Sequence, residues 1–342
     1  MKLIRLNERP NDWNCIIKRY ETKTLFHEAA WLDHISSIHP EGRIEYFRIA
    51  EGSNTLGYLC GLRFRKFLLS VFGSPLRGTG TNYMGPIVNR GVDQAKLVQA
   101  ILEEFKKNGI AHLEFSNDWL ESGVMKAQGF NVHHSVTHIC PLPDNEEAAW
   151  GLLRSTCRNR IRKAEKNGLV VEMTDDPSIV DHFYSQYKEV YGKQGLAVGY
   201  DIDRPRSLFN ALMPADRIFP LWVKHKGEVI AAGFFPHDER CVYFWGAASW
   251  LKYHPLCPNE ILHWTVTKLA IARHIPLYNM CGGTSQFKDK FGGSDVPYVT
   301  YTRSFLPFLE AARKLYTYVH FRKLKLLGWL RPSDVPRKKR VG

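Results

Sequence analysis

The chain has 342 residues, of which 44% are hydrophobic and 13% aromatic, a composition typical of folded proteins and not of disordered ones. It contains no apolar stretch long enough to cross a membrane and no apolar signal core near its first residue, so we expect no export. Its seven cysteines are dispersed without a Cys-x-x-Cys pair, which predicts reduced thiols in the cytoplasm and argues against disulfides and a metal site.

The net charge of +13 is concentrated in two segments. Residues 154–166 contain six arginines and lysines against Glu165 alone, and residues 303–342 contain eleven against two acidic residues. Localised charge of this kind favours particular anionic partners over a generally basic protein.

In the first half of the chain, helical spacing predicts a helix over residues 26–37, which Pro40 and Gly42 end. Two strands then follow as a hairpin, over 44–50 and 56–64. An amphipathic helix over 92–107 leads into an alternating strand over 110–115.

The second half repeats this order. The predicted elements are helices over 146–167 and 177–193, strands over 218–225, 228–236 and 241–248, a helix over 259–274 and a strand over 277–280. The repetition predicts an α+β fold with mixed sheets, built from a duplicated unit that divides near Pro141 and Pro143. We therefore expect an N-terminal domain over 1–142, a C-terminal domain over 143–305, and a basic amphipathic helix and tail over 306–342.

The segment from Tyr278 to Gly293, YNMCGGTSQFKDKFGG, is the most informative one in the chain. An apolar strand ends on Gly282 and Gly283, and a polar turn leads to a short helix that presents Lys288. Glycines at such a turn let a ligand approach the backbone closely, and the lysine offers it a positive charge. An ordinary strand–turn–helix connection with solvated lysines has the same local pattern.

This order of elements in two copies resembles the GNAT acyltransferase superfamily, and two segments resemble its Fem transferases. Residues 152–172 (LLRSTCRNRIRKAEKNGLVVE) resemble the Arg- and Lys-rich segment of that family, and residues 282–293 resemble its Gly-Gly…Phe-Lys-x-x-Phe-Gly-Gly motif. Met84-Gly85-Pro86 is similar to the Gly-Pro turn of the family's first domain. The resemblance implies two GNAT-like domains in tandem, in enzymes that join amino acids to peptidoglycan precursors.

The chain also departs from these relatives. It lacks the coiled-coil arm that several Fem transferases carry, and Asn279 stands where an aspartate is frequent. The Arg/Gln-x-x-Gly-x-Gly phosphate loop of ordinary GNAT enzymes is missing as well.

The resemblance implies an acyl-transfer site in the second domain, with Lys288 contacting an oxyanion or a phosphate. Tyr243 is our candidate for protonating the leaving group, although an aromatic residue on a strand is more often in the core. For coenzyme A we consider Lys252 and His254, with Asn259 capping a helix whose N–H groups face the pyrophosphate. The candidate substrate contacts are Phe287, Gly282, Gly283, Tyr83, Arg158 and Arg162. A solvated helix face or an interdomain contact is an equally good interpretation of the two arginines.

Three functions stay open on this evidence. The first is an N-acyltransferase that joins the acyl group of a coenzyme A thioester to a nucleotide-linked amino sugar for surface polysaccharide. The second is a Fem-type transferase that moves an amino acid from aminoacyl-tRNA to a peptidoglycan precursor, for which the basic segments are suited. The third is a non-catalytic adaptor that touches the inner face of the cytoplasmic membrane through residues 306–330. The absent arm favours the first function, the absent phosphate loop favours the second, and no DNA partner is expected.

Overall fold

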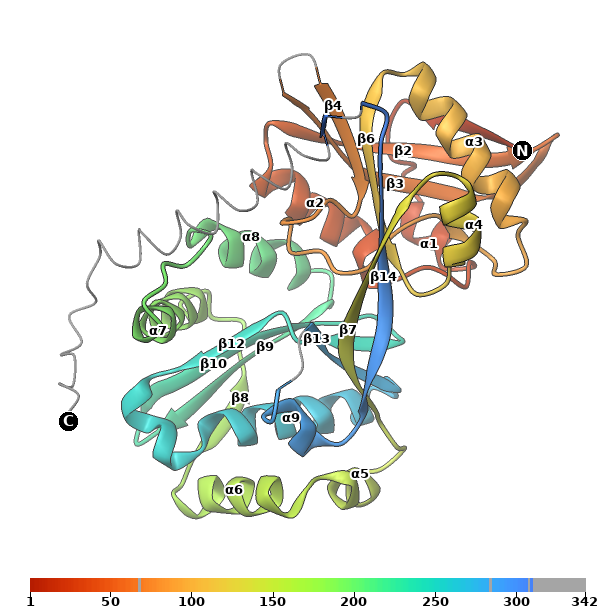
Figure 1. The fold of residues 1–342 in the computed structure, drawn as a ribbon. Coiled ribbons are helices and arrows are strands. Elements are labelled where there is room, and N and C mark those ends of the chain that lie inside the picture. Colours follow the sequence, from red (N-terminus) through yellow and green to blue (C-terminus); the bar gives the residue numbers. More distant parts are fainter. Residues whose placement is uncertain (67–68, 283–284, 307, 310–342) are drawn as a thin grey trace, which may run out of the picture.

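The computed structural model describes residues 1–66, 69–282, 285–306 and 308–309. Two similar α+β halves lie one above the other, each with helices on both faces of its sheet (Figure 1). Most of the predicted basic helix over 306–330, and the basic tail at 337–340, lie outside the described residues. Among the helices that the structure describes, none is both long and apolar enough to span a bilayer.

The first half is a sheet with helices on its two faces. Helix α3 shows why the local sequence folds as it does: Asp93 caps its start by accepting the N–H of Lys96, and Lys106 and Lys107 lie in its last turn, where positive charge is favourable. The strands are β1 (Lys2–Leu6), β2 (Gly42–Glu51), β3 (Asn54–Lys66), β4 (Leu69–Ser74), β5 (Ile87–Val88) and β6 (Ile110–Asn117). The helices are α1 (Trp13–Ile17), the 3-10 turn η1 (Leu25–His27), α2 (Ala29–Ile38), α3 (Gln94–Lys107) and α4 (Ser122–Ala127).

In the second half, α7 and α8 cover one face of a sheet with the order β12-β10-β9-β8, and α9 covers the other, with α5 and α6 beyond it (Figure 1). Its strands are β8 (Val170–Met173), β9 (Ile218–His225), β10 (Glu228–Pro236), β11 (Cys241–Tyr243), β12 (Gly246–Ser249) and β13 (Leu277–Gly282). Its helices are α5 (Glu146–Leu152), α6 (Ser155–Lys166), α7 (Ile179–Lys193), α8 (Asp203–Leu212), η2 (Leu251–Leu256), α9 (Pro258–Ala272) and η3 (Lys288–Phe291).

Two long strands join the halves. β14 (Ser294–Ser304) pairs with β6 on one side and with β7 (Asn131–Pro141) on the other, and β7 in turn pairs with β13. In the described residues a single sheet therefore runs β1-β2-β3-β4-β6-β14-β7-β13-β11. The predicted domain boundary at residue 142 directly follows β7 and stays a prediction.

Several predicted elements are confirmed, and two need correction. β9 and β10 match the predicted strands at both ends. The helix predicted over 146–167 is wrong as one element, because Leu153 is extended and the N–H of Arg154 donates to the carbonyl of Lys290, which ends α5 and starts α6 anew. The strand predicted over 241–248 is also interrupted, at Phe244 and Trp245. β1, β4, β7, β14 and α8 were not predicted.

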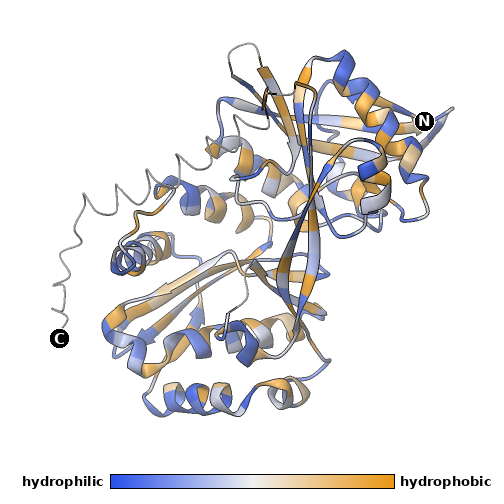
Figure 2. Ribbon diagram, in the orientation of Figure 1, coloured by the Kyte–Doolittle hydropathy of each residue, from blue (hydrophilic) through white to orange (hydrophobic). Residues whose placement is uncertain are grey.

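Three apolar clusters stabilise this arrangement. One lies between the first sheet and α3, and a second lies between the second sheet, α9 and α6. The third combines Trp31 and Tyr83 of the first half with Phe183 and Tyr243 of the second, so apolar burial crosses the boundary between the halves. Hydrophilic residues lie along the outer helices α3, α5 and α6, interspersed with apolar ones (Figure 2).

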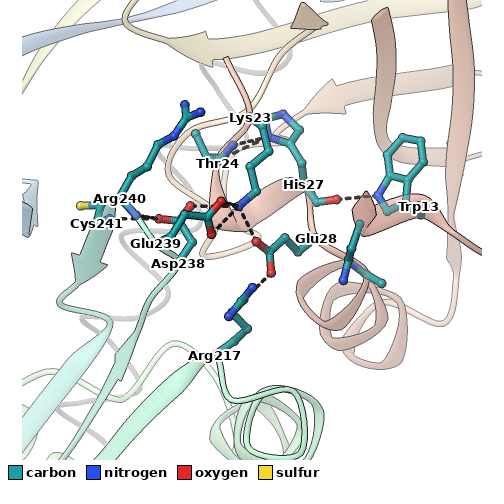
Figure 3. A network of polar contacts seen from close by, with 12 residues as sticks. Trp13, Lys23, Thr24, His27, Glu28, Arg217, Asp238, Glu239, Arg240 and Cys241 are labelled. Atoms are coloured by element: carbon teal, nitrogen blue, oxygen red, sulfur yellow. Dashed lines mark hydrogen bonds and ion pairs between the residues drawn. The ribbon is translucent and has the colours of Figure 1, made fainter. Parts of the chain in front are cut away.

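A buried group of charges joins the two halves beside this cluster (Figure 3). The Lys23 ammonium lies 2.5 Å from Glu28, 3.1 Å from Glu239 and 3.6 Å from Asp238. Glu28 also accepts from Arg217 at 2.6 Å, so side chains from both halves complete the group. Burial alone lowers the pKa of Lys23, but the carboxylates around it raise that pKa overall.

Removing the lysine should leave these carboxylates buried without their central cation. We expect Lys23→Met to lower the free energy of unfolding by about 3–5 kcal/mol, the usual cost of breaking a buried ion pair from one side. Urea unfolding at neutral pH measures this change.

The matched control is Arg206→Met, because Arg206 forms only exposed pairs with Asp203 and Asp181. That variant should cost less than about 1 kcal/mol. Equal losses for the two variants would show that the buried group contributes no more than a surface pair.

Candidate acyl-transfer site

The candidate site lies where the chain after β11 separates from β13 in the second half. β11 pairs in parallel with β13 over Cys241–Tyr243, and the N–H of Phe244 still donates to the carbonyl of Asn279 at 2.9 Å. The chain then diverges, and β12 stays paired with β10 only. In the first half the corresponding strand β4 remains on β6 from Ser70 to Ser74. The duplicated unit is therefore closed in one half and open in the other.

Lys288 lies where β13 ends in this split. Its ammonium donates to the carbonyl oxygens of Cys281 at 2.8 Å and Gly282 at 2.7 Å. These two hydrogen bonds tie the Lys288 side chain to the end of β13. The side chain is buried, and this burial lowers the pKa of Lys288 against the opposing effects of Cys281 and Asp295. The interpretation as a solvated surface lysine is therefore wrong. Gly283 lies outside the described residues.

The second glycine pair fixes the turn against β7. Gly293 has a φ of +83°, and a Cβ there would lie 2.2 Å from the carbonyl oxygen of Ile139, so no other residue fits. His138 of β7 bonds to the carbonyl of Gly292 at 2.8 Å and to Asp295 at 2.9 Å. These contacts hold the Lys288 turn from the side of the joining strands.

The two sequence motifs meet at Glu260. This buried carboxylate of α9 accepts from Lys290 at 2.6 Å and from Arg160 of α6 at 2.9 Å. Burial alone raises the pKa of Glu260, but the hydrogen bonds from Lys290 and Arg160 lower it overall. Arg160, which sequence reasoning did not select, thus links the Arg-rich segment to the Lys288 turn.

A cleft that is lined mainly by residues with polar side chains lies near the same turn. Its volume is about 830 Å³, and it is lined by the loop 75–82, by β6, β7 and β14, and by Arg204 of α8. Asn82 in this loop donates to the Cys281 sulfur at 3.1 Å, and a Cβ on Gly282 would lie 4.0 Å from the Tyr298 hydroxyl of β14. Asn82, Arg204 and Tyr298 were not singled out from the sequence, because each becomes part of the site only through strand pairing or loop contacts across the two halves.

The comparisons with known proteins agree with this geometry. Residues 152–289 match the model of the acetyltransferase (GNAT) domain family. The second half of the chain therefore contains a GNAT acyltransferase domain. No curated protein sequence matches the chain.

Solved structures similar to this chain show the tandem arrangement. FemX shares 13% identity at a TM-score of 0.72, with 94% of this chain and 100% of FemX covered. A tandem GNAT protein from the clavulanic acid biosynthesis pathway shares 11% identity at 0.53, covering 90% and 99%. The C-terminal domain of a putative lysylphosphatidylglycerol synthetase from Agrobacterium fabrum shares 11% at 0.57, covering 89% and 93%. The chain thus has the FemX-like fold of two GNAT domains in tandem.

Two predicted aromatic residues of the GNAT site lie on either side of the boundary between the halves. Tyr83 packs edge-on against Tyr298 at 5.1 Å, and its ring lies 6.4 Å from that of Tyr243. Tyr243 is buried against Phe26 at 4.7 Å, and burial raises its pKa well above the ordinary value. A neutral hydroxyl of this kind retains its proton, and its role as an acid stays a prediction.

Phe287 and the two predicted arginines are not among the residues that line the cleft. Phe287 is half-buried beside His263 of α9, at 5.2 Å. Arg158 donates to the carbonyl of Leu153 at 2.6 Å, and Arg162 lies 5.4 Å over the ring of Trp150. The structure therefore places these arginines against α5, apart from Tyr83 and Tyr298.

The residues considered for coenzyme A lie at the start of α9. Lys252 and His254 are exposed, and Lys252 is paired with Glu228 at 3.2 Å. The predicted capping by Asn259 is wrong, because Cys257 is the N-cap residue and Asn259 is the second residue of the helix. Within the described ranges, no group of three or more His, Cys, Asp or Glu side chains is arranged to hold a metal ion.

His263 supports the site from within the core and should make stability sensitive to acid. Its Nδ1 lies 2.6 Å from the Tyr278 hydroxyl, and burial lowers its pKa to about 3. The imidazole therefore stays neutral in the folded state while the unfolded chain takes up a proton below about pH 6.5. Stability is present above that pH and is lost as the pH falls towards 3, at about 1.4 kcal/mol per pH unit for each such histidine.

We expect His263→Gln to lessen this dependence by about that slope, measured by urea unfolding between pH 5 and 7. His254→Gln, at an exposed position, should leave the dependence as in the wild type. An unchanged slope in His263→Gln would mean that this histidine is not held neutral.

Proposed function

We propose that this GNAT acyltransferase is a Fem-type aminoacyltransferase, which takes an aminoacyl group from charged tRNA and joins it to an amine of an acceptor in the interdomain cleft. The acceptor, by resemblance to the Fem family, is a peptidoglycan precursor. The observation that carries the proposal is the start of α9, which is poorly built for the pyrophosphate of coenzyme A. Since charged tRNA is a cytoplasmic donor, the proposal keeps the predicted location.

A pyrophosphate at a helix start needs a row of free N–H groups. Here Pro255 and Pro258 have no N–H to give, and the carboxylate of Glu260 lies in the first turn. Lys290 and Arg160 are engaged by that carboxylate and offset its charge. These features weigh against acyl-CoA, the donor that the missing arm favours, and support the aminoacyl-tRNA alternative.

The chemistry is an exchange of an ester for an amide. The amine nitrogen of the acceptor attacks the ester carbonyl of the donor, and the carbonyl oxygen becomes an oxyanion. The bond to the ribose oxygen then breaks, and the proton lost by the amine ends on that oxygen. Stabilisation of the oxyanion by a fixed positive charge is the largest contribution that a protein can make to such a step.

We assign that contribution to Lys288 and the proton transfer to Tyr243. The lysine is fixed by two carbonyls at the end of β13, so its charge does not have to reorganise when the oxyanion forms. Tyr243 stands on β11, opposite Asn279 and just before the strands diverge, and its protonated hydroxyl suits donation to the departing ribose oxygen.

The cleft suits an anionic, elongated acceptor. Its volume of about 830 Å³ is in the range of ligand sites, and most of its lining residues have polar side chains. Arg77 and Arg204 line it, and Arg204 is held by the carbonyl of Gly78 at 3.0 Å. Guanidinium groups at fixed positions recognise phosphate and carboxylate groups well.

The donor is decided by supplying both candidates in parallel. The protein is incubated with total tRNA charged with labelled amino acids and a muramyl-pentapeptide precursor, and separately with acyl-CoAs and a nucleotide-linked 3- or 4-amino sugar. We expect label in the peptide precursor and no release of free thiol from the acyl-CoAs. Thiol release that requires the amino sugar, without transfer from tRNA, would instead establish the acyl-CoA reaction.

We expect Lys288→Ala to lower kcat/KM for this transfer by about 10²-fold or more, as for loss of an oxyanion-stabilising group. The control is Lys126→Ala on α4, where the lysine is exposed and outside the site. Near wild-type kcat/KM in a folded Lys288→Ala protein would remove Lys288 from the mechanism.

A further inference from the structure

The outward face of α6 is strongly basic. Cys157, Ile161 and Ala164 are its buried residues, so helical periodicity places Arg162, Lys163 and Lys166 on the opposite side, and all three are exposed. Within the part of the chain that the structure describes, none of the three pairs with a carboxylate. The face therefore keeps its positive charge for a partner.

Helix α6 begins next to the Lys288 turn, and its basic face lies towards the opposite end of the helix. The N–H of Arg154, at the start of α6, donates to the carbonyl of Lys290 at 2.9 Å. Farther along the helix, Arg160 shares Glu260 with Lys290. Helix α6 runs for 12 residues, about 18 Å, on the side of α9 that faces away from the second sheet (Figure 1).

We propose that the basic face of α6, formed by Arg162, Lys163 and Lys166, binds phosphates of the RNA donor and guides its charged 3′ end to the Lys288 turn. This inference rests on the proposed aminoacyl-tRNA function. It assigns the donor to a surface separate from the cleft that receives the acceptor. The acceptor enters from the cleft between the halves. Two polyanionic substrates then need not compete for one entrance.

RNA suits this face better than a lipid surface does. A helix that lies on a membrane presents apolar residues to the bilayer beside its basic ones. The outward face of α6 contains Ser155 and Asn159 between its cations and no apolar side chain. Lysines and arginines on a polar background match a phosphate backbone, whose binding is mainly electrostatic.

The test measures binding of uncharged tRNA to the full-length protein at several salt concentrations. We expect R162Q/K163Q/K166Q to weaken binding by at least about 10-fold near 0.1 M salt, and to lower the slope of log K against log salt by about 2–3. K163Q/K166Q keeps the contact of Arg162 with Trp150 and should show most of the effect in a protein with unchanged folding. The control K106Q/K107Q/K126Q removes three exposed lysines of α3 and α4 and should bind like the wild type, apart from a small loss common to any reduction of net charge.

The activity assay separates this inference from the proposed function. Turnover of charged tRNA should show a raised KM and a nearly unchanged kcat in both α6 variants, while a short aminoacyl-adenosine donor should be used equally by wild type and variants. Transfer from charged tRNA with the same KM and salt slope in all proteins would overturn the α6 surface and leave the function intact. Loss of binding to phosphatidylglycerol vesicles without loss of RNA binding would also overturn it, in favour of a membrane surface. If tRNA binds through α6 and no aminoacyl transfer occurs, the function fails and the surface stands.

Discussion

A buried lysine requires the two halves to meet. An ammonium removed from water as completely as that of Lys23 is costly unless carboxylates surround it, and Asp238 and Glu239 come from the second half. Both acidic residues lie in the turn that leads from β10 into β11, so the charge group fixes the point at which β11 begins. Tyr243, the last residue of β11, then packs against Phe26 and Tyr83 of the first half. The position of the candidate site thus depends on the Lys23 charge group, which needs residues from both halves.

The two copies of the duplicated unit differ in one pair of parallel strands. The pair stays together in the first half and separates in the second. In the first half β4 keeps its parallel partner β6, and the cis bond before Pro75 leads the chain away into the cleft-lining loop. In the second half β11 leaves β13 after Tyr243, and the Lys288 turn occupies the end of the opening. Glu260 and His138 hold this turn from opposite sides. Duplication therefore provides one half that carries the Lys288 turn and another whose loop lines the cleft.

The sequence predicted what depends on local pattern. The hairpin of β9 and β10 follows from two apolar runs on either side of a Lys226-Gly227 turn, and its bounds were predicted correctly. β14 was missed because its residues are half-buried on an irregular pattern and their partners are more than 150 residues away. The partners of Lys288 could not be predicted either, because they are backbone carbonyls, which every residue type has. Asn259 failed as a cap because Cys257, in a left-handed conformation, is the N-cap residue, two positions before the residue that side-chain preference favours.

The bonds of Lys288 also change the charge that the end of β13 presents, which matters for the proposed oxyanion contact. Two carbonyl oxygens at a strand end present partial negative charge to the split, and this charge would repel a developing oxyanion. Both oxygens accept from the same ammonium, so their negative ends are offset by a full positive charge at under 3 Å. Burial enlarges this effect, since the lower local dielectric strengthens the field that the lysine projects into the opening. Under the proposed function, a lysine that its own backbone holds in place would not have to reorganise when the oxyanion forms, because folding has already fixed its position.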